Sequence, residues 1–127
     1  MRASCHCGAV VLEVTLSDGL ASAGRCDCSF CRRRAAPAVT APKDGVRIIR
    51  GAENLTTYQW GTKTAKHHFC NVCGIYMYHN RRSNPDEIGV NMGALDGVNP
   101  ADHEPIPWHD GVNHPSDAAP DKKPESR

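Results

Sequence analysis

The sequence predicts a single, mainly β domain, and three observations support this prediction. Short stretches rich in β-branched and aromatic residues recur at intervals of roughly 8–12 residues, with turn residues between them. No window of about 11 residues or more repeats its apolar residues at the spacing of an amphipathic helix. The length of 127 residues also suits one domain.

The composition predicts a thin hydrophobic core. Only 39% of the residues are hydrophobic and 6% are aromatic, while 11 are glycine and nine are proline. A loop-rich chain with so little apolar packing benefits from a cross-link, which is either a disulfide or a bound metal.

Alternation and turn residues locate the strands. The first is expected over 9–16, "AVVLEVTL", where apolar residues occupy every second position before the turn sequence "SDG". Residues 46–51 alternate in the same way, and residues 55–60 are β-branched and aromatic; both stretches stop at a glycine. The other expected strands are 65–69, 75–79 and 87–95.

Two regions are expected to lack regular structure. Residues 20–34 hold three cysteines and are expected to form a loop, and Pro37 and Pro42 interrupt the segment that follows. Beyond Pro115 the chain is rich in proline and charge and has no apolar anchor. We therefore expect one domain over 1–115 and a disordered tail over 116–127.

Charge and hydropathy narrow the cellular setting. The N-terminal segment lacks the uninterrupted apolar run of a signal peptide, and no stretch approaches the ~18 apolar residues of a membrane span. The net charge of +1 gives no reason to expect nucleic acid or a membrane surface as a partner. We expect a cytoplasmic protein, in which clustered cysteines indicate metal binding or catalysis rather than disulfides.

The seven cysteines fall into three groups, "CHC", "CDCSFC" and "CNVC". A C-x-x-C pair followed by glycine, as in "CNVCG", is typical of half of a tetrahedral zinc site. Pairing it with "CHC" gives a closed four-thiolate site that joins the N-terminus to the middle of the chain, and leaves three cysteines for an open site. The closed, structural site would be Cys5, Cys7, Cys70 and Cys73; the open, catalytic one would be Cys26, Cys28 and Cys31.

Several alternatives stay open at this point. One of the histidines nearest the motifs, His6, His67 or His68, would complete a Cys3His site and make the second site purely structural. Cys26, Cys28 and Cys31 could also form a four-thiolate site with one cysteine of "CNVC". Iron can replace zinc in a four-thiolate site, and disulfides are the least favoured arrangement.

An open three-thiolate zinc site favours thiol chemistry. The ion and its three thiolates carry a net charge of −1, so the site polarises a carbonyl poorly but accepts a further thiolate readily. A thiol that coordinates there loses its proton and becomes nucleophilic. The sequence therefore predicts activation of a small-molecule thiol for attack on an aldehyde. The arginines 32–34 would either offset the negative charge or form a solvated surface.

Some aromatic and histidine side chains lie near the motifs. His67 and His68 are expected on opposite faces of a strand, so that at most one faces the metal region. We expect one of them on the surface and the other half-buried behind the metal ligands; the alternative is that this second histidine passes a proton to the product oxygen. Tyr76 and Tyr78 are expected to share a strand face and to serve packing. The sequence assigns no residue as general acid or base.

The order of these motifs resembles a known family. The stretches "SCHCGAVVLEV", "CDCSFCRRR", "HHFCNVCGIYMYH", "GVNMGALDG" and "HDGVNHP" are similar to the glutathione-dependent formaldehyde-activating enzyme family, which also includes centromere protein V. The resemblance implies a β-tent of small antiparallel sheets held by two zinc ions per chain. It places the closed site on the first set of four cysteines and the open site on the set of three.

The resemblance also implies an activity. Family members combine glutathione with formaldehyde to give S-(hydroxymethyl)glutathione, a carbon–sulfur lyase reaction in the synthase direction, with the glutathione sulfur on the second zinc. The partners would then be a small-molecule thiol and an aldehyde. The alternative is a non-catalytic zinc-binding module that binds a partner protein.

Overall fold

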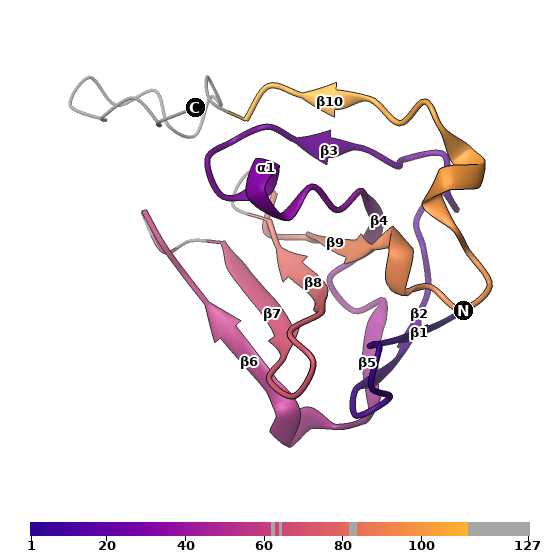
Figure 1. The fold of residues 1–127 in the computed structure, drawn as a ribbon, viewed down its shortest axis with the longest axis vertical. Helices are drawn as coiled ribbons and strands as arrows, with labels where there is room; N and C mark the ends of the chain where they lie inside the picture. Colours follow the sequence, from indigo (N-terminus) through magenta and orange to yellow (C-terminus); the bar gives the residue numbers. More distant parts are fainter. Residues whose placement is uncertain (62, 64, 82–83, 112–127) are drawn as a thin grey trace.

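The computed structural model describes residues 1–61, 63, 65–81 and 84–111. This part of the chain is mainly β, with three small sheets and a single α-helix of four residues (Figure 1). The predicted fold class is confirmed. The tail expected over 116–127 lies outside the described residues.

The largest sheet is antiparallel and forms the scaffold of the molecule. Its five strands are β4 (Ala38–Pro42), β6 (Leu55–Tyr58), β7 (Lys66–Cys70), β8 (Tyr76–Asn80) and β9 (Glu87–Asn91). They lie in the order β4-β9-β8-β7-β6, so that β4 and β6 are the edges. The register shifts between His68 and Phe69, which indicates a β-bulge where β7 pairs with β8.

Two smaller sheets complete the fold. The strands β1 (Arg2–Ser4), β2 (Val11–Val14) and β5 (Val46–Arg50) form an antiparallel sheet in the order β1-β2-β5. The two-residue strands β3 (Arg25–Cys26) and β10 (Trp108–His109) pair in parallel, and in Figure 1 they lie side by side next to the helix α1 (Cys31–Arg34). Short 3₁₀ turns occupy Ala52–Asn54, Met92–Ala94 and Pro100–His103.

The core lies where the three-stranded and five-stranded sheets face each other. Alternation along β2 buries Leu12 and Val14, and these pack in one cluster with side chains from the large sheet. The largest fully buried side chains are Val10, Leu12, Val14, Val39, Cys70, Met77, Val90 and Met92. Cys70 belongs to this set, so one cysteine of the expected four-cysteine site is part of the hydrophobic core.

The structure departs from the expected elements in several places. The expected loop over 20–34 contains the short strand β3 and the helix α1, and β1 and β10 were not expected. Residues 38–42 form a strand although prolines were expected to interrupt them; Pro42 is tolerated because it is the last residue of an edge strand. The strand expected over 87–95 ends at Asn91, where the Asn91 side chain accepts a hydrogen bond from the Gly93 amide and starts a 3₁₀ turn.

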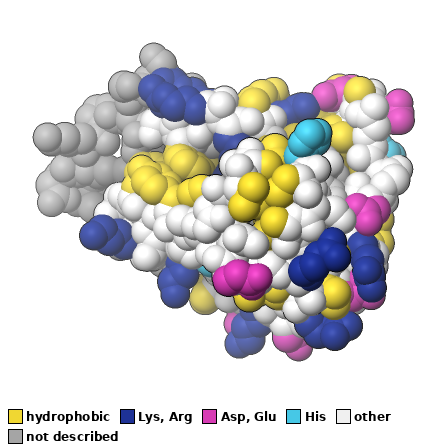
Figure 2. All heavy atoms as spheres, turned by 60° about the horizontal axis from the view of Figure 1, so that its bottom comes forward, with side chains coloured by type: hydrophobic (Ala, Val, Ile, Leu, Met, Phe, Trp, Pro, Cys, Tyr) yellow, Lys and Arg dark blue, Asp and Glu magenta, His cyan; other side chains and the backbone are white. Residues whose placement is uncertain are grey.

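The surface drawn in Figure 2 mixes charges of both signs, with basic and acidic side chains interspersed among apolar ones. Large apolar side chains that remain exposed include Ile48 and Ile49 on β5, Val72 in the β7–β8 turn and Trp108 on β10. Among the described residues, every helix is too short to cross a bilayer.

Candidate metal centres

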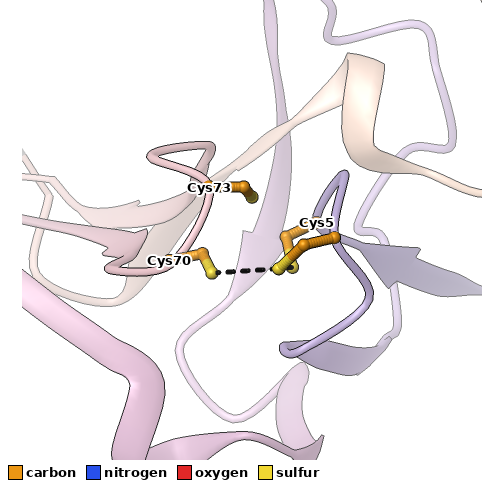
Figure 3. A group of neighbouring side chains, drawn as sticks. Cys5, Cys70 and Cys73 are labelled. Carbon is orange, nitrogen blue, oxygen red and sulfur yellow. Dashed lines mark hydrogen bonds between the residues drawn. The ribbon is translucent and has the colours of Figure 1, made fainter.

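Two turns bring four cysteines together at one end of the core. The sulfur atoms of Cys5, Cys7, Cys70 and Cys73 all lie within 4.8 Å of one another. Cys5 and Cys7 come from the β1–β2 turn, Cys70 is the last residue of β7, and Cys73 lies in the turn that follows it. These two parts of the chain approach each other in Figure 3.

In both turns a glycine amide donates to the carbonyl of the first cysteine, three residues back in one turn and four residues back in the other. The amide of Gly8 donates to the Cys5 carbonyl at 3.1 Å, and the amide of Gly74 donates to the Cys70 carbonyl at 2.8 Å. Both glycines have a positive φ, +82° and +80°, which other residues rarely adopt. Each turn also aims a backbone amide at its first sulfur: that of Val10 at Cys5, 3.2 Å away, and that of Val72 at Cys70, 3.4 Å away.

The spacing of these sulfurs fits a tetrahedral thiolate site. Neighbouring sulfurs are 3.6 Å apart between Cys5 and Cys7 and 3.7 Å apart between Cys7 and Cys70. A tetrahedron with metal–sulfur bonds of ~2.3 Å has sulfur–sulfur edges of ~3.8 Å, whereas a disulfide is only ~2.05 Å long. All seven cysteines are unpaired, so this group could hold a metal ion.

A second group of sulfurs comes from a single loop. The sulfur atoms of Cys26, Cys28 and Cys31 also lie within 4.8 Å of one another. The loop begins at the end of β3 and ends at the first residue of α1, and the Cys31 amide donates to the Cys28 sulfur at 3.3 Å. Among the described residues, no fourth His, Cys, Asp or Glu ligand atom joins the group.

The three thiols of this loop influence one another strongly. Hydrogen bonds from the thiols of Cys26 and Cys31 lower the pKa of Cys28 to about 2. The pKa of Cys31 is raised, because its thiol hydrogen-bonds to Cys26 and Cys28 and because it is buried. One thiolate therefore forms readily and opposes the ionisation of its neighbours. A cation is what would allow all three to ionise, and this donor set suits zinc.

A glycine near the end of the described chain packs directly on this loop. A Cβ atom placed on Gly111 would lie 2.1 Å from the Cys26 sulfur and 3.0 Å from the Cys28 Cβ. The Gly111 amide donates to Asp27 Oδ1 at 2.9 Å, which fixes the approach. The backbone at this position therefore forms one wall of the three-cysteine group.

A cavity of about 280 Å³ opens beside the three sulfurs. Polar side chains from three different elements line it: Arg34 from α1, His67 from β7 and His79 from β8. Trp60 and His109 contribute aromatic walls. A cavity with sulfur, guanidinium and imidazole groups around one space has room for a small polar ligand.

Of the three consecutive arginines, only Arg34 turns into the site. Its Nη2 lies 3.8 Å from the Cys31 sulfur, and its Nη1 lies 3.2 Å from His67 Nδ1. The guanidinium carbon sits 3.6 Å above the Tyr76 ring, a cation–π contact. Arg33 is exposed and hydrogen-bonds to the Ser29 carbonyl. The expectation that one of these arginines offsets the charge of the thiolates is compatible with the position of Arg34.

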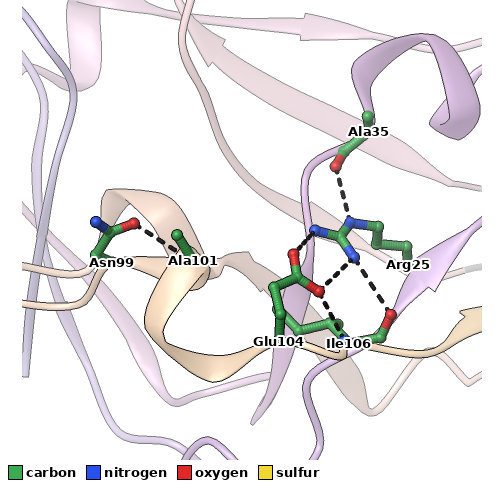
Figure 4. A network of polar contacts seen from close by, with 6 residues as sticks. All are labelled: Arg25, Ala35, Asn99, Ala101, Glu104 and Ile106. Atoms are coloured by element: carbon green, nitrogen blue, oxygen red, sulfur yellow. Dashed lines mark hydrogen bonds and ion pairs between the residues drawn. The ribbon is translucent and has the colours of Figure 1, made fainter.

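Arg25 lines the same cavity but is already engaged by the protein. Its guanidinium pairs with Glu104 at 2.7 Å and also donates to the carbonyls of Ala35 and Ile106 (Figure 4). The pair raises the pKa of Arg25 and lowers that of Glu104, in both cases chiefly through the hydrogen bond between them. Arg25 thus ties the segment before β10 to β3 and α1.

The two neighbouring histidines do point to different surroundings. His67 is buried and contacts Arg34, while His68 hydrogen-bonds to Thr57 Oγ1 at 2.9 Å and Asn80 Oδ1 at 2.7 Å. Neither belongs to the three-cysteine group, and neither does His6.

Tyr76 and Tyr78 both serve packing, as expected, but they contact different neighbours. The register shift places Tyr76 and Tyr78 among different neighbours: the Tyr76 ring lies against Arg34, and the Tyr78 ring packs on His68 with 4.4 Å between ring centroids. Sequence reasoning also missed His79, which pairs across the strands with His67 and stacks on it at 5.2 Å. No local pattern signals this pairing, because it depends on the register of the two strands.

Comparisons with known proteins show to which family this chain belongs. Residues 1–108 match the family model described as glutathione-dependent formaldehyde-activating enzyme. A crystal structure of a Rhodobacter sphaeroides protein is similar to this one, with a TM-score of 0.84 and 61% sequence identity, over 86% of this chain and 100% of that chain. With a family match over most of its length, this chain belongs to the glutathione-dependent formaldehyde-activating enzyme family.

Proposed function

We propose that this protein is a zinc-dependent enzyme that activates a small-molecule thiol of the glutathione type and adds it to an aldehyde such as formaldehyde. The reaction is that of a carbon–sulfur lyase running in the synthase direction. The ligands would be Cys5, Cys7, Cys70 and Cys73 for a structural zinc and Cys26, Cys28 and Cys31 for a catalytic zinc.

The observation that carries this proposal is the three-cysteine group beside a cavity. Three sulfurs from one loop lie close enough together to serve as three ligands of one metal ion, and the cavity of about 280 Å³ lies next to them. Structural zinc sites are closed by four protein ligands, whereas catalytic ones keep a position for substrate. The four-cysteine group meets the first description, and the three-cysteine group meets the second.

The family supplies the substrate class, and the protein's own groups are consistent with it. When bound, zinc would lower the pKa of an incoming thiol and hold its thiolate. Arg34, 3.8 Å from the Cys31 sulfur, places a positive charge beside the thiolates and reduces their repulsion of an incoming anion.

The reaction needs no further reactant. The thiol sulfur forms a bond to the carbonyl carbon, the π-electron pair moves to the carbonyl oxygen, and a proton equivalent to the one lost by the thiol ends on that oxygen. The product is a hemithioacetal.

The unpaired state of all seven cysteines also supports a location in a reducing compartment such as the cytoplasm.

Exchange NMR on formaldehyde and glutathione tests this proposal. The zinc-loaded protein should accelerate their exchange beyond the spontaneous rate measured with metal-free protein. Native mass spectrometry should show two zinc ions and a glutathione adduct, and the adduct should disappear in Cys28→Ser while the fold persists. Two zinc ions without any affinity for thiols would contradict the enzyme and favour the non-catalytic module.

A further inference from the structure

The contact between Arg34 and His67 fixes which nitrogen of the histidine carries hydrogen. Arg34 Nη1 lies 3.2 Å from His67 Nδ1. A guanidinium group can only donate hydrogen bonds, so Nδ1 must accept one. The neutral His67 ring then carries its hydrogen on Nε2.

The surroundings of His67 keep this ring neutral. The side chain is 6% exposed. Its pKa is lowered to about 4, chiefly by burial and then by the positive charge of Arg34, against the opposing effect of Cys28. The other titratable group packed on the ring is His79 of β8, whose pKa is lowered well below its usual value, first by burial. At neutral pH both rings are uncharged.

The remaining edge of His67 is free to meet a ligand. Its ring packs against Phe30, with 4.4 Å between ring centroids, and against His79 at 5.2 Å. His67 also lines the cavity beside the three sulfurs. Within the described part of the chain, no residue hydrogen-bonds to Nε2, so the N–H group is available to a molecule in that cavity.

We propose that His67 is a catalytic residue that donates a hydrogen bond from Nε2–H to the carbonyl oxygen of the aldehyde, and that Arg34 is the positioning residue that fixes the required tautomer. This assignment rests on the proposed function. As the thiolate sulfur bonds to the carbonyl carbon, negative charge develops on the oxygen, and a neutral N–H donor in a buried site stabilises it. The proton that completes the hydroxyl group comes from solvent and replaces the one that the thiol released.

Arg34 contacts both the three-cysteine group and His67. One end of its guanidinium lies at the Cys31 sulfur, 3.8 Å away, and the other at His67. Its place above the Tyr76 ring at 3.6 Å limits its movement. Because Cys31 and Arg34 are one helical turn apart in α1, the same turn sets the sulfur and the histidine in fixed relation.

The tautomer can be measured without any reaction. Long-range ¹H–¹⁵N correlation spectra of ¹⁵N-labelled, zinc-loaded protein distinguish a protonated ring nitrogen from an unprotonated one. We expect His67 to show hydrogen on Nε2 only, with no titration between pH 5 and 8. Hydrogen on Nδ1, or a charged ring at pH 7, would overturn the proposal. Arg34→Gln should allow a mixture of tautomers, and Arg34→Lys, which keeps a donor, should restore part of the Nε2–H form.

The catalytic role is tested by the protein-dependent exchange rate between formaldehyde and glutathione. Loss of one donor to a developing oxyanion lowers a rate by on the order of 100-fold. We expect a loss of about that size in His67→Leu, a smaller loss in His67→Gln, which keeps an N–H donor, and little change in His68→Gln. Native mass spectrometry on each variant should still show two zinc ions and the glutathione adduct.

The outcomes separate this assignment from the proposed function. If the wild-type protein accelerates exchange and His67→Leu does so equally well, the role of His67 is wrong while the enzyme stands. If the wild-type protein neither binds glutathione nor accelerates exchange, the proposed function is wrong, and the role of His67 is wrong with it.

Discussion

The sulfur atoms of Cys7 and Cys70 lie 3.7 Å apart, although 63 positions separate the two residues in the sequence. This contact joins the turn of the small sheet to the turn of the large sheet. Cys70 is fully buried in the hydrophobic core, whereas Cys7 is exposed. A metal at this point would therefore act on the packing of both sheets at once.

The first prediction compares one cysteine from each group. Cys70→Ser should strip the metal from the four-cysteine group and unfold the domain, because binding at a structural zinc site contributes on the order of 10 kcal/mol, as much as a typical domain's whole stability. Cys26→Ser should leave a folded protein with one zinc ion fewer, since its group lies within one loop. Circular dichroism and native mass spectrometry measure both effects. Equal unfolding of the two variants would contradict this assignment of roles.

The sequence predicts those strands and turns that a local residue pattern marks. Strand β2 is recognisable because Val10, Leu12 and Val14 alternate toward one core, and "CNVCG" is recognisable because cysteine spacing and glycine are local. Strands β3 and β10 are not recognisable. Each has two residues and exists only because Trp108 pairs with Arg25, far away in the sequence.

The cysteine groups are likewise predictable, but the side chains around the second one are not. Nothing in "RRR" distinguishes Arg34 from its two neighbours. The single turn of α1 makes the difference, because it brings the Arg34 side chain next to the Cys31 sulfur. The contact of His67 with His79 depends on strand register, and the position of Tyr76 depends on a β-bulge. Register and bulges are set by tertiary packing, which no local pattern in this sequence encodes.

The second prediction concerns the backbone wall at Gly111. Gly111→Ala places a methyl group where the Cys26 sulfur lies, 2.1 Å from the ideal Cβ position, so the loop must shift. We expect zinc affinity at the three-cysteine group to fall about 10–100-fold, as when an outer-shell partner of a metal site is lost. The four-cysteine group should keep its metal. Competition with a chromophoric chelator measures the two affinities.

A matched substitution tests the cause of that effect. Gly93→Ala meets its nearest neighbour, Asn91 Oδ1, at 3.4 Å, which is ordinary contact, and the next nearest atoms belong to Pro100 and not to a cysteine. It should change neither zinc affinity. Unchanged zinc binding by Gly111→Ala would show that the backbone at Gly111 does not pack on the three-cysteine loop as described.

The third prediction concerns Gly51, whose backbone lies close to that of Ala9 and Val10, just before β2. Its φ is +88°, and a Cβ atom there would lie 1.9 Å from the Ala9 carbonyl oxygen. Gly51→Ala should lower the free energy of unfolding by about 2–5 kcal/mol, through left-handed strain and overpacking together. Gly97→Ala, at φ +79° with nothing within 4 Å, should cost only about 1–2 kcal/mol. Urea unfolding at saturating zinc measures both; equal losses would contradict the close approach at Gly51.

The fourth prediction concerns the ion pair between Arg25 and Glu104. Hydrogen bonding to Arg25 lowers the pKa of Glu104 below the usual carboxyl value of 4.5. A carboxyl whose pKa is lower in the folded state stabilises that state above the unfolded value. This stabilisation is lost as the pH falls through the lower, folded value. Glu104→Gln removes the carboxylate, so it should be less stable than the wild type at neutral pH and equally stable at sufficiently acid pH.

The difference between wild type and Glu104→Gln is the quantity to follow, because acid releases metal from both proteins alike and this effect cancels. Thermal unfolding at several pH values should show the gap closing as the pH drops below 4.5, the usual carboxyl value. Asp86→Asn is the matched control: its partner Lys43 lies 3.3 Å away, but the two side chains are 75% and 68% exposed. Exposed ion pairs contribute little to the free energy of unfolding, so the stability of this variant should match that of the wild type at every pH. A gap that persists unchanged into acid would show that Glu104 acts through packing rather than through its charge.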